Sequence, residues 1–280
     1  MIIFKKADDI QFFLKDKAAL TGFVPTMGAL HSGHISLINA SRQANAYTVC
    51  SIFVNPVQFN DPKDYDKYPI TIEKDILMLE QAGCDILFLP SVHEIYPQGT
   101  QLEKKYNLGY LETVLEGKYR PGHFQGVCMV IDRLLSIVTC SNLYIGQKDY
   151  QQCMVIKKLV ELKNLQLSVN VNICATLREK DGLAMSSRNM RLNEDERKKA
   201  VTIYQVLEYL KKNYTAENLK QLKSNAEEML KENGFKPDYV EIADAENLSA
   251  ISEWDGKAKI VALVAAFLNE VRLIDNMVLN

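Results

Sequence analysis

The feature that most constrains the fold is an alternation of short apolar runs with helical segments through the first 175 residues of the chain. The runs are continuously apolar and β-branched, a pattern typical of strands in a parallel sheet that is covered on both faces. We expect strands at residues 22–24, 47–54, 86–89, 143–145 and 167–173. We expect helices at residues 35–46, 72–82, 127–138 and 155–162. The alternation predicts an α/β domain with a doubly wound parallel sheet.

The character of the sequence changes after about residue 176. Two long and charged stretches, at 194–210 and 217–233, favour helices. Strands of a separate small sheet are predicted at 239–243, 258–267 and 271–274. We therefore predict two domains, with the α/β domain at residues 1–176 and a smaller α+β domain at residues 177–280.

The composition excludes several classes of protein. Hydrophobic residues make up 47% and charged residues 24% of the 280 residues, the profile of a globular protein with a sizeable core. The formal net charge of −2 gives no reason to expect a nucleic acid or a membrane surface as a partner. No apolar stretch approaches the ~18–20 residues of a membrane span. Since the six cysteines include no C-x-x-C pair, we expect reduced core thiols in a cytoplasmic protein.

A glycine-bearing turn with two histidines follows the first apolar run. In it Met27 and Gly28 lead to His31 and His34, at the point where a helix begins. Backbone N–H groups at a helix N-terminus attract anions, and histidine adds donors near neutral pH. The turn lacks both the P-loop and the G-x-G-x-x-G patterns. Phosphate binding is one interpretation; two surface histidines or a helix cap is the other, and zinc lacks a third ligand nearby.

A second cluster lies at residues 180–189, where a lysine and a glycine precede Ser186, Ser187 and Arg188. Hydroxyl and N–H groups donate to phosphate oxygens, and an arginine can pair with two of them. The segment is therefore either a loop that closes over phosphates or an interdomain linker in which a serine caps a helix.

Three further loops carry polar residues. Lys148 and Asp149 follow the 143–145 strand directly, where ligands bind in a doubly wound fold, although a solvated turn is the alternative. The loops at 54–59 and 115–124 are ambiguous by themselves.

The order of these motifs along the chain is more specific than any one of them. They run P-T-M-G-A-L-H-S-G-H, S-I-F-V-N-P-V-Q-F, E-I-Y-P, L-E-G-K-Y-R-P-G-H-F, G-Q-K-D-Y-Q-Q, K-D-G-L-A-M-S-S-R-N and R-L-I-D-N. From about residue 22 to residue 276 the series resembles the pantothenate synthetase (pantoate–β-alanine ligase) family of the nucleotidylyltransferase superfamily. The resemblance implies a Rossmann-like N-terminal domain with a smaller C-terminal lid domain.

The resemblance also implies an activity. The family couples pantoate to β-alanine through a pantoyl adenylate, with release of pyrophosphate and then AMP. ATP is the co-substrate, Mg²⁺ accompanies it, and a homodimer is expected. One alternative is another nucleotidylyltransferase that acts on a phosphorylated acceptor. A second is a catalytically silent nucleotide-binding regulator, which would lack the motifs that this chain retains.

Site residues follow from the matched motifs. The implied catalytic residues are His31, His34, Lys148 and Arg188. The implied ATP-binding residues are Met27, His31, His34, Gly146, Lys148, Asp149, Met185, Ser186, Ser187 and Arg188. Gln58, Gln152 and Arg120 would bind pantoate, and Asp75 would be a magnesium ligand or support one. Two positions depart from the family pattern: Gln147 stands where glutamate is common, and Ile70 stands where arginine is frequent.

Overall fold

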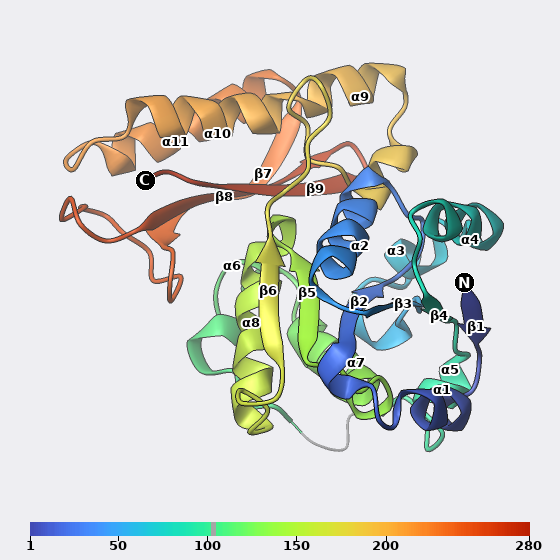
Figure 1. Cartoon of the computed structure of the whole chain (residues 1–280). Coiled ribbons are helices and arrows are strands. Elements are labelled where there is room, and N and C mark those ends of the chain that lie inside the picture. The colour runs from blue at the N-terminus through green and yellow to red at the C-terminus, as the bar shows by residue number, and fades with distance from the viewer. Residues whose placement is uncertain (102–104) are drawn as a thin grey trace. The chain divides into compact units, whose positions relative to one another are not determined.

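The computed structural model describes residues 1–101 and 105–280. Two compact units make up this part of the chain (Figure 1). The first comprises residues 1–147 and 152–175, and the second comprises residues 148–151 and 176–280. The roles expected of them, a binding domain and a lid, remain predictions.

The first unit is built on a parallel sheet. Within the described residues its six strands are β1 (Ile2–Phe4), β2 (Thr21–Thr26), β3 (Tyr47–Ile52), β4 (Ile86–Phe88), β5 (Asn142–Gly146) and β6 (Asn170–Cys174). Their order is β1-β4-β3-β2-β5-β6, and every pairing is parallel. The predicted parallel α/β sheet is therefore confirmed.

Helices cover both faces of this sheet. Those of the first unit are α1 (Ala7–Leu14), α2 (Ser32–Ala44), α3 (Pro62–Asp66), α4 (Ile72–Gln81), α5 (Val92–Ile95), α6 (Leu115–Tyr119), α7 (His123–Ile137) and α8 (Tyr150–Leu162). Successive strand residues point to opposite faces. Accordingly Phe23 lies in a core cluster with residues of α1, α7 and α8, whereas its neighbour Val24 lies in a cluster with residues of α2 and α4.

The direction of winding reverses between β2 and β5. The strands that follow β2 in the chain, β3 and β4, lie on one side of it, and β5 and β6 lie on the other. The register places Gly22 opposite Asn142 and Phe23 opposite Leu143. In open α/β sheets ligands bind outside the carboxyl ends of the strands at such a reversal. The segments that follow Thr26 and Gly146 are thus where a ligand site belongs.

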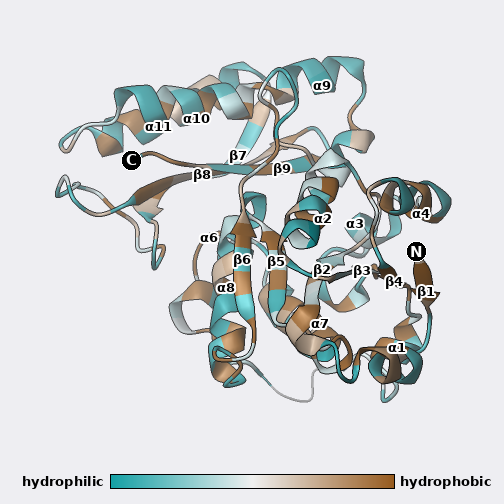
Figure 2. Cartoon of the chain, in the orientation of Figure 1, coloured by the Kyte–Doolittle hydropathy of each residue, from teal (hydrophilic) through white to brown (hydrophobic). Residues whose placement is uncertain are grey.

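The second unit has its own sheet and core. The helices α9 (Glu194–Ala200), α10 (Thr202–Asn213) and α11 (Leu219–Glu232) precede the antiparallel strands β7 (Phe235–Asp244), β8 (Ile260–Leu268) and β9 (Val271–Val278). Apolar residues of α10 and α11 share one buried cluster with those of the three strands. Figure 2 shows hydrophilic and hydrophobic residues side by side along both helices, as amphipathic packing requires. The expected small α+β sheet is confirmed.

Several boundaries differ from expectation. The edge strand β1 was not expected, because it has only three residues and Ile2 and Ile3 are 47% and 42% exposed. The strand expected from residue 167 begins at Asn170, since Leu167 is 98% exposed in a turn. The helix expected at 194–210 is two helices that meet at Val201. Adjacent Val201 and Thr202 are β-branched and stiff, which weakens a continuous helix there.

The helices and the cysteines concern the environment of the chain. Within the described residues every helix is too short or too polar to cross a bilayer. All six cysteines are free thiols, five buried and Cys174 partly exposed. Burial raises the pKa of Cys84 to about 11 and those of Cys128 and Cys140 to about 12.

Candidate active site

A buried carboxylate fixes the turn between β2 and α2. Gly28 adopts a φ of 80°, a left-handed conformation that favours glycine. Asp75, fully buried on α4, accepts the N–H groups of Ala29 at 2.9 Å and Leu30 at 2.8 Å. The Thr71 hydroxyl donates to the same carboxylate at 3.0 Å. Both carboxylate oxygens thus fix the path of the turn.

The resemblance implies a magnesium role for Asp75, and the structure gives this residue a different one. Both of its oxygens accept hydrogen bonds inside the core. Among the described residues no three or more His, Cys, Asp or Glu side chains are grouped so that they could hold a metal ion. Asp75 is a positioning residue here, and a direct contact to magnesium remains a prediction.

The two histidines cap α2. His31 is the N-cap residue, and its Nδ1 accepts the N–H of Gly33 at 3.1 Å. Nδ1 of His34 accepts the N–H of His31 at 3.4 Å, so the two rings form a reciprocal capping box. An accepting Nδ1 carries no proton, so each neutral ring carries its proton on Nε2. The helix-cap alternative is therefore correct, and the same cap makes the Nε2 atom of each ring a donor.

Gln58 ends a 3₁₀ turn, Pro56–Gln58, and its amide is oriented by Asn55. Asn55 Oδ1 accepts the Tyr96 hydroxyl at 2.9 Å, while Asn55 Nδ2 donates to Gln58 Oε1 at 3.2 Å. Gln58 Nε2 is consequently turned to the Met27 sulfur, 2.9 Å away. The structure thus brings Met27 and Gln58 together. The roles of Asn55 and Tyr96 were missed, although both lie in quoted motifs.

Arg120 has a supporting place in the same region. Its Nη1 lies 3.5 Å from a Glu116 carboxylate oxygen and 3.1 Å from His123 Nε2. Arginine can only donate, so His123 Nε2 accepts and His123 Nδ1 donates to the Gln58 carbonyl at 2.8 Å. Arg120 and His123 therefore hold the backbone of the Gln58 turn. Whether Arg120 also contacts a substrate carboxylate stays a prediction.

The end of β5 leads into the second set of predicted residues. Gly146 ends the strand, and a 3₁₀ turn at Gln147–Asp149 precedes α8. Lys148 Nζ lies 3.6 Å from Asp149 Oδ1, and the Lys148 carbonyl accepts Asn276 Nδ2 at 2.7 Å. Gln152 is half-buried in the first turn of α8. The departure at Gln147 lies in this turn, whereas Ile70 is 73% exposed.

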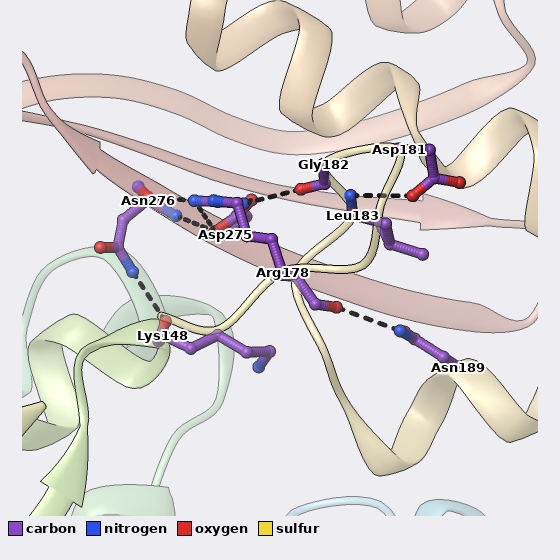
Figure 3. A network of polar contacts seen from close by, with 9 residues as sticks. Lys148, Arg178, Asp181, Gly182, Leu183, Asn189, Asp275 and Asn276 are labelled. Atoms are coloured by element: carbon purple, nitrogen blue, oxygen red, sulfur yellow. Dashed lines mark hydrogen bonds and ion pairs between the residues drawn. The ribbon is translucent and has the colours of Figure 1, made fainter. Parts of the chain in front are cut away.

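The loop at residues 178–191 is ordered by local contacts, some of which Figure 3 shows. Ser186 caps the 3₁₀ helix Ser187–Arg191 by accepting the Arg188 N–H at 3.3 Å. Asn189 Nδ2 donates to the Ala184 carbonyl at 3.0 Å. The serine cap of the linker alternative is present, in a loop with defined structure. Met185 and Ser187 belong to the same loop, and Ser187 is buried.

A buried ion pair lies beside this loop. Asp275 on β9 receives Arg178 Nη1 at 2.5 Å and Nη2 at 3.1 Å. Burial raises the pKa of the Asp275 carboxyl, while Arg178 and, more weakly, Lys148 act to lower it. This pair was not anticipated, although the sequence R-L-I-D-N contains Asp275.

The predicted residues thus form two groups. Met27, His31, His34 and Gln58 gather near the carboxyl ends of β2 and β3 in the first unit. Lys148, Asp149 and the residues from Met185 to Arg188 belong to the second unit.

Comparison with known proteins identifies the family. The family model described as pantoate-beta-alanine ligase matches residues 2–278. A pantothenate synthetase of Cytophaga hutchinsonii is 46% identical over 270 residues, which cover 95% of this chain and 93% of that protein. The solved structure of the Thermus thermophilus pantothenate synthetase is 39% identical, with a TM-score of 0.89 and 99% of both chains covered.

A third relative is described with its ligands. The Francisella tularensis pantoate-beta-alanine ligase, solved in complex with beta-gamma ATP and beta-alanine, is 37% identical, with a TM-score of 0.82. It covers 99% of this chain and 97% of its own. The chain belongs to the pantoate–β-alanine ligase family.

Proposed function

We propose that this protein catalyses the ATP-dependent condensation of pantoate with β-alanine to pantothenate. Pantoate carboxylate attacks the α-phosphorus of ATP, which gives pantoyl adenylate and releases pyrophosphate. The β-alanine amine then attacks the acyl carbon and releases AMP. The observation that carries the proposal is the family match over residues 2–278. The same match favours the ligase over a nucleotidylyltransferase that acts on a phosphorylated acceptor.

The first step brings an anion to a triphosphate, so the protein has to offset negative charge. The Nε2 atoms of His31 and His34 are donors at the N-terminus of α2, where the helix dipole also favours an anion. Lys148 and Arg188 add two cations. Catalysis in this proposal is positioning and electrostatic stabilisation, with no covalent enzyme intermediate.

Pantoate is assigned to the two glutamines. Asn55 engages Gln58 Oε1, so Gln58 presents its Nε2 donor beside the Met27 sulfur. A thioether is a weak acceptor, and a substrate hydroxyl or carboxylate oxygen would replace it at a gain. Gln152 would supply the second amide. Asp149 would bind the ribose, and Gly146, Met185, Ser186 and Ser187 would line the phosphates.

Magnesium and the assembly complete the proposal. Among the described residues no group of three or more His, Cys, Asp or Glu side chains could hold the ion by itself, and Asp75 already accepts two backbone N–H groups of the turn. We therefore assign Mg²⁺ to the phosphate oxygens of ATP, where it keeps much of its water. We also propose a homodimer in the cytoplasm; the six free cysteines support that location.

Pyrophosphate exchange tests the function. Labelled pyrophosphate should enter ATP only when pantoate is present, and pantothenate should form when β-alanine is added. Lys148→Ala is the control, with exchange at least about 10²-fold slower. Exchange that proceeds equally without pantoate would overturn the substrate assignment.

A further inference from the structure

A single arginine organises the loop that carries Ser186 and Arg188. Besides its two bonds to Asp275, Arg178 donates through Nη1 to the Gly182 carbonyl at 3.1 Å and through Nη2 to the Asn276 carbonyl at 3.2 Å. Its guanidinium also lies 4.9 Å from the centre of the Tyr204 ring. Only the planar fork of arginine makes this set of bonds, because lysine presents one ammonium.

The C-terminal end of the loop, at Asn189, is also held next to Arg178. Arg178 pairs with Ala184 in an isolated antiparallel bridge, and the Ala184 carbonyl accepts Asn189 Nδ2 at 3.0 Å. Residues 178–189 are therefore closed at their base, directly beside the Arg178–Asp275 pair (Figure 3).

Asn276 extends the contacts to the Lys148 turn. Asp275 Oδ1 accepts the Asn276 N–H at 2.8 Å, and Asn276 Nδ2 donates to the Lys148 carbonyl at 2.7 Å (Figure 3). A second bond holds the same short segment, because the Tyr150 hydroxyl donates to the Ala245 carbonyl at 2.7 Å. Residues 148–151 are thus fixed to the second unit at two points.

These contacts join two segments to which the proposed function gives separate roles. We propose that Arg178, Asp275 and Asn276 are positioning residues that hold the Lys148 turn and the loop of Ser186 and Arg188 in one fixed arrangement. The inference rests on the proposed function, which gives both segments a role in binding phosphates. A misplacement of about 1 Å can cost a reaction about 10²-fold, so the rate of adenylation should depend on this arrangement.

Asn276→Ala is the sharpest test, because it removes the donor to Lys148 and leaves the ion pair intact. Pantoate-dependent pyrophosphate exchange should show kcat lowered about tenfold or more, with the KM for pantoate unchanged. Asp238→Asn is the matched control, since Asp238 forms a partly buried pair with Arg272 at 2.7 Å in the same sheet. It should leave kcat and both KM values near those of the wild type.

A second comparison separates positioning from mere folding. In the Lys148→Ala background, Asn276→Ala should cost much less than it does in the wild type, because the side chain that it positions is gone. Arg178→Lys keeps the charge but not the fork, and should also lower kcat.

Each outcome has a distinct meaning. Wild-type protein without pantoate-dependent exchange would overturn the proposed function itself. Active wild type with an Asn276→Ala variant as fast as Asp238→Asn would overturn only the positioning role. Equal losses from Asn276→Ala in both backgrounds would also overturn it, because that result reports a general loss of structure.

Discussion

At the scale of single residues, three side chains of the candidate site each serve two purposes. His31 and His34 cap α2 through Nδ1, and the same bonds place the proton on Nε2. Asn55 likewise caps a 3₁₀ turn and fixes which end of the Gln58 amide is the donor. Changes at these residues should therefore affect stability and activity together.

His34→Ala should lower the rate of pantoate-dependent pyrophosphate exchange by about 10²-fold or more, because a preorganised donor to the phosphate is lost. Loss of half of the capping box should also lower the free energy of unfolding by about 1 kcal/mol. Exchange assays and urea denaturation measure the two effects. A variant with the wild-type exchange rate would contradict the assignment of this ring to phosphate.

Tyr96→Phe should raise the KM for pantoate several-fold and leave the KM for ATP unchanged. The change removes the donor that orients Asn55, so the Gln58 amide is free to turn over. Steady-state kinetics with each substrate varied provides the measurement. The control is Tyr106→Phe, because the Tyr106 hydroxyl donates instead to Asp132, at 2.9 Å. Equal effects of the two variants on the KM for pantoate would contradict the role of the Tyr96–Asn55–Gln58 hydrogen bonds.

At the scale of elements, several parts of the fold depend on contacts supplied from far along the chain. Lys6, the N-cap residue of α1, offers no side-chain cap. Glu94 takes that place: its carboxylate accepts the Ala7 N–H at 2.8 Å and Lys6 Nζ at 3.1 Å. A second long-range contact depends on a glycine. Helix α7 packs closely against the Gln58 turn because Gly126 has no side chain.

The Glu94 cap should make stability depend on pH. The Ala7 N–H, and then Lys6, lower the pKa of Glu94 below its ordinary value. A lowered pKa in the folded protein stabilises it above the ordinary pKa, and that contribution disappears as the pH falls through the folded value. Glu94→Gln should therefore lower Tm at pH 7, and this difference from the wild type should shrink as the pH falls through the lowered pKa of Glu94. Glu227→Gln, in an exposed pair with Lys231, is the control and should leave Tm unchanged at both neutral and acidic pH.

Gly126→Ala should destabilise the protein by about 1–3 kcal/mol, the range for overpacking. A Cβ at residue 126 would lie 2.5 Å from the Val57 carbonyl oxygen and 2.6 Å from the Gln58 Cα. The displaced turn should also raise the KM for pantoate. Urea denaturation and kinetics test both effects against Ser136→Ala, an exposed position of the same helix. A variant that is destabilised but keeps the wild-type KM for pantoate would contradict the predicted displacement of the Gln58 turn.

At the scale of the whole molecule, local pattern predicted the elements, and long-range contact decided how the site is held. The strand–helix alternation was enough for the parallel sheet, the second sheet and most helices. The Tyr96–Asn55 bond joins residues 41 apart, and the Arg178–Asp275 pair joins residues 97 apart. No local sequence pattern predicts either pair, because the sequence around each residue does not indicate its distant partner. The motifs led to a prediction of which residues belong to the site, and they carried no information about what orients those residues.

The distribution of cysteines also concerns the whole molecule. In native protein, Cys174 should react first with a thiol reagent such as DTNB, and the other five thiols should react only after unfolding. Burial both shields those five and, for four of them, raises the pKa, which lowers the thiolate fraction. Absorbance before and after urea counts the two classes. More than one fast thiol per native chain would contradict the burial described.

The pairing of β2 with β5 has a consequence for the order of folding. The pairing joins Gly22 to Asn142, 120 residues later, so the segments at the carboxyl ends of these strands meet only after a long loop has closed. Contacts of such long range slow folding. During synthesis the ribosome must therefore release at least half of the polypeptide before these two segments can meet. In refolding, affinity for ATP should accordingly return after most of the helical signal.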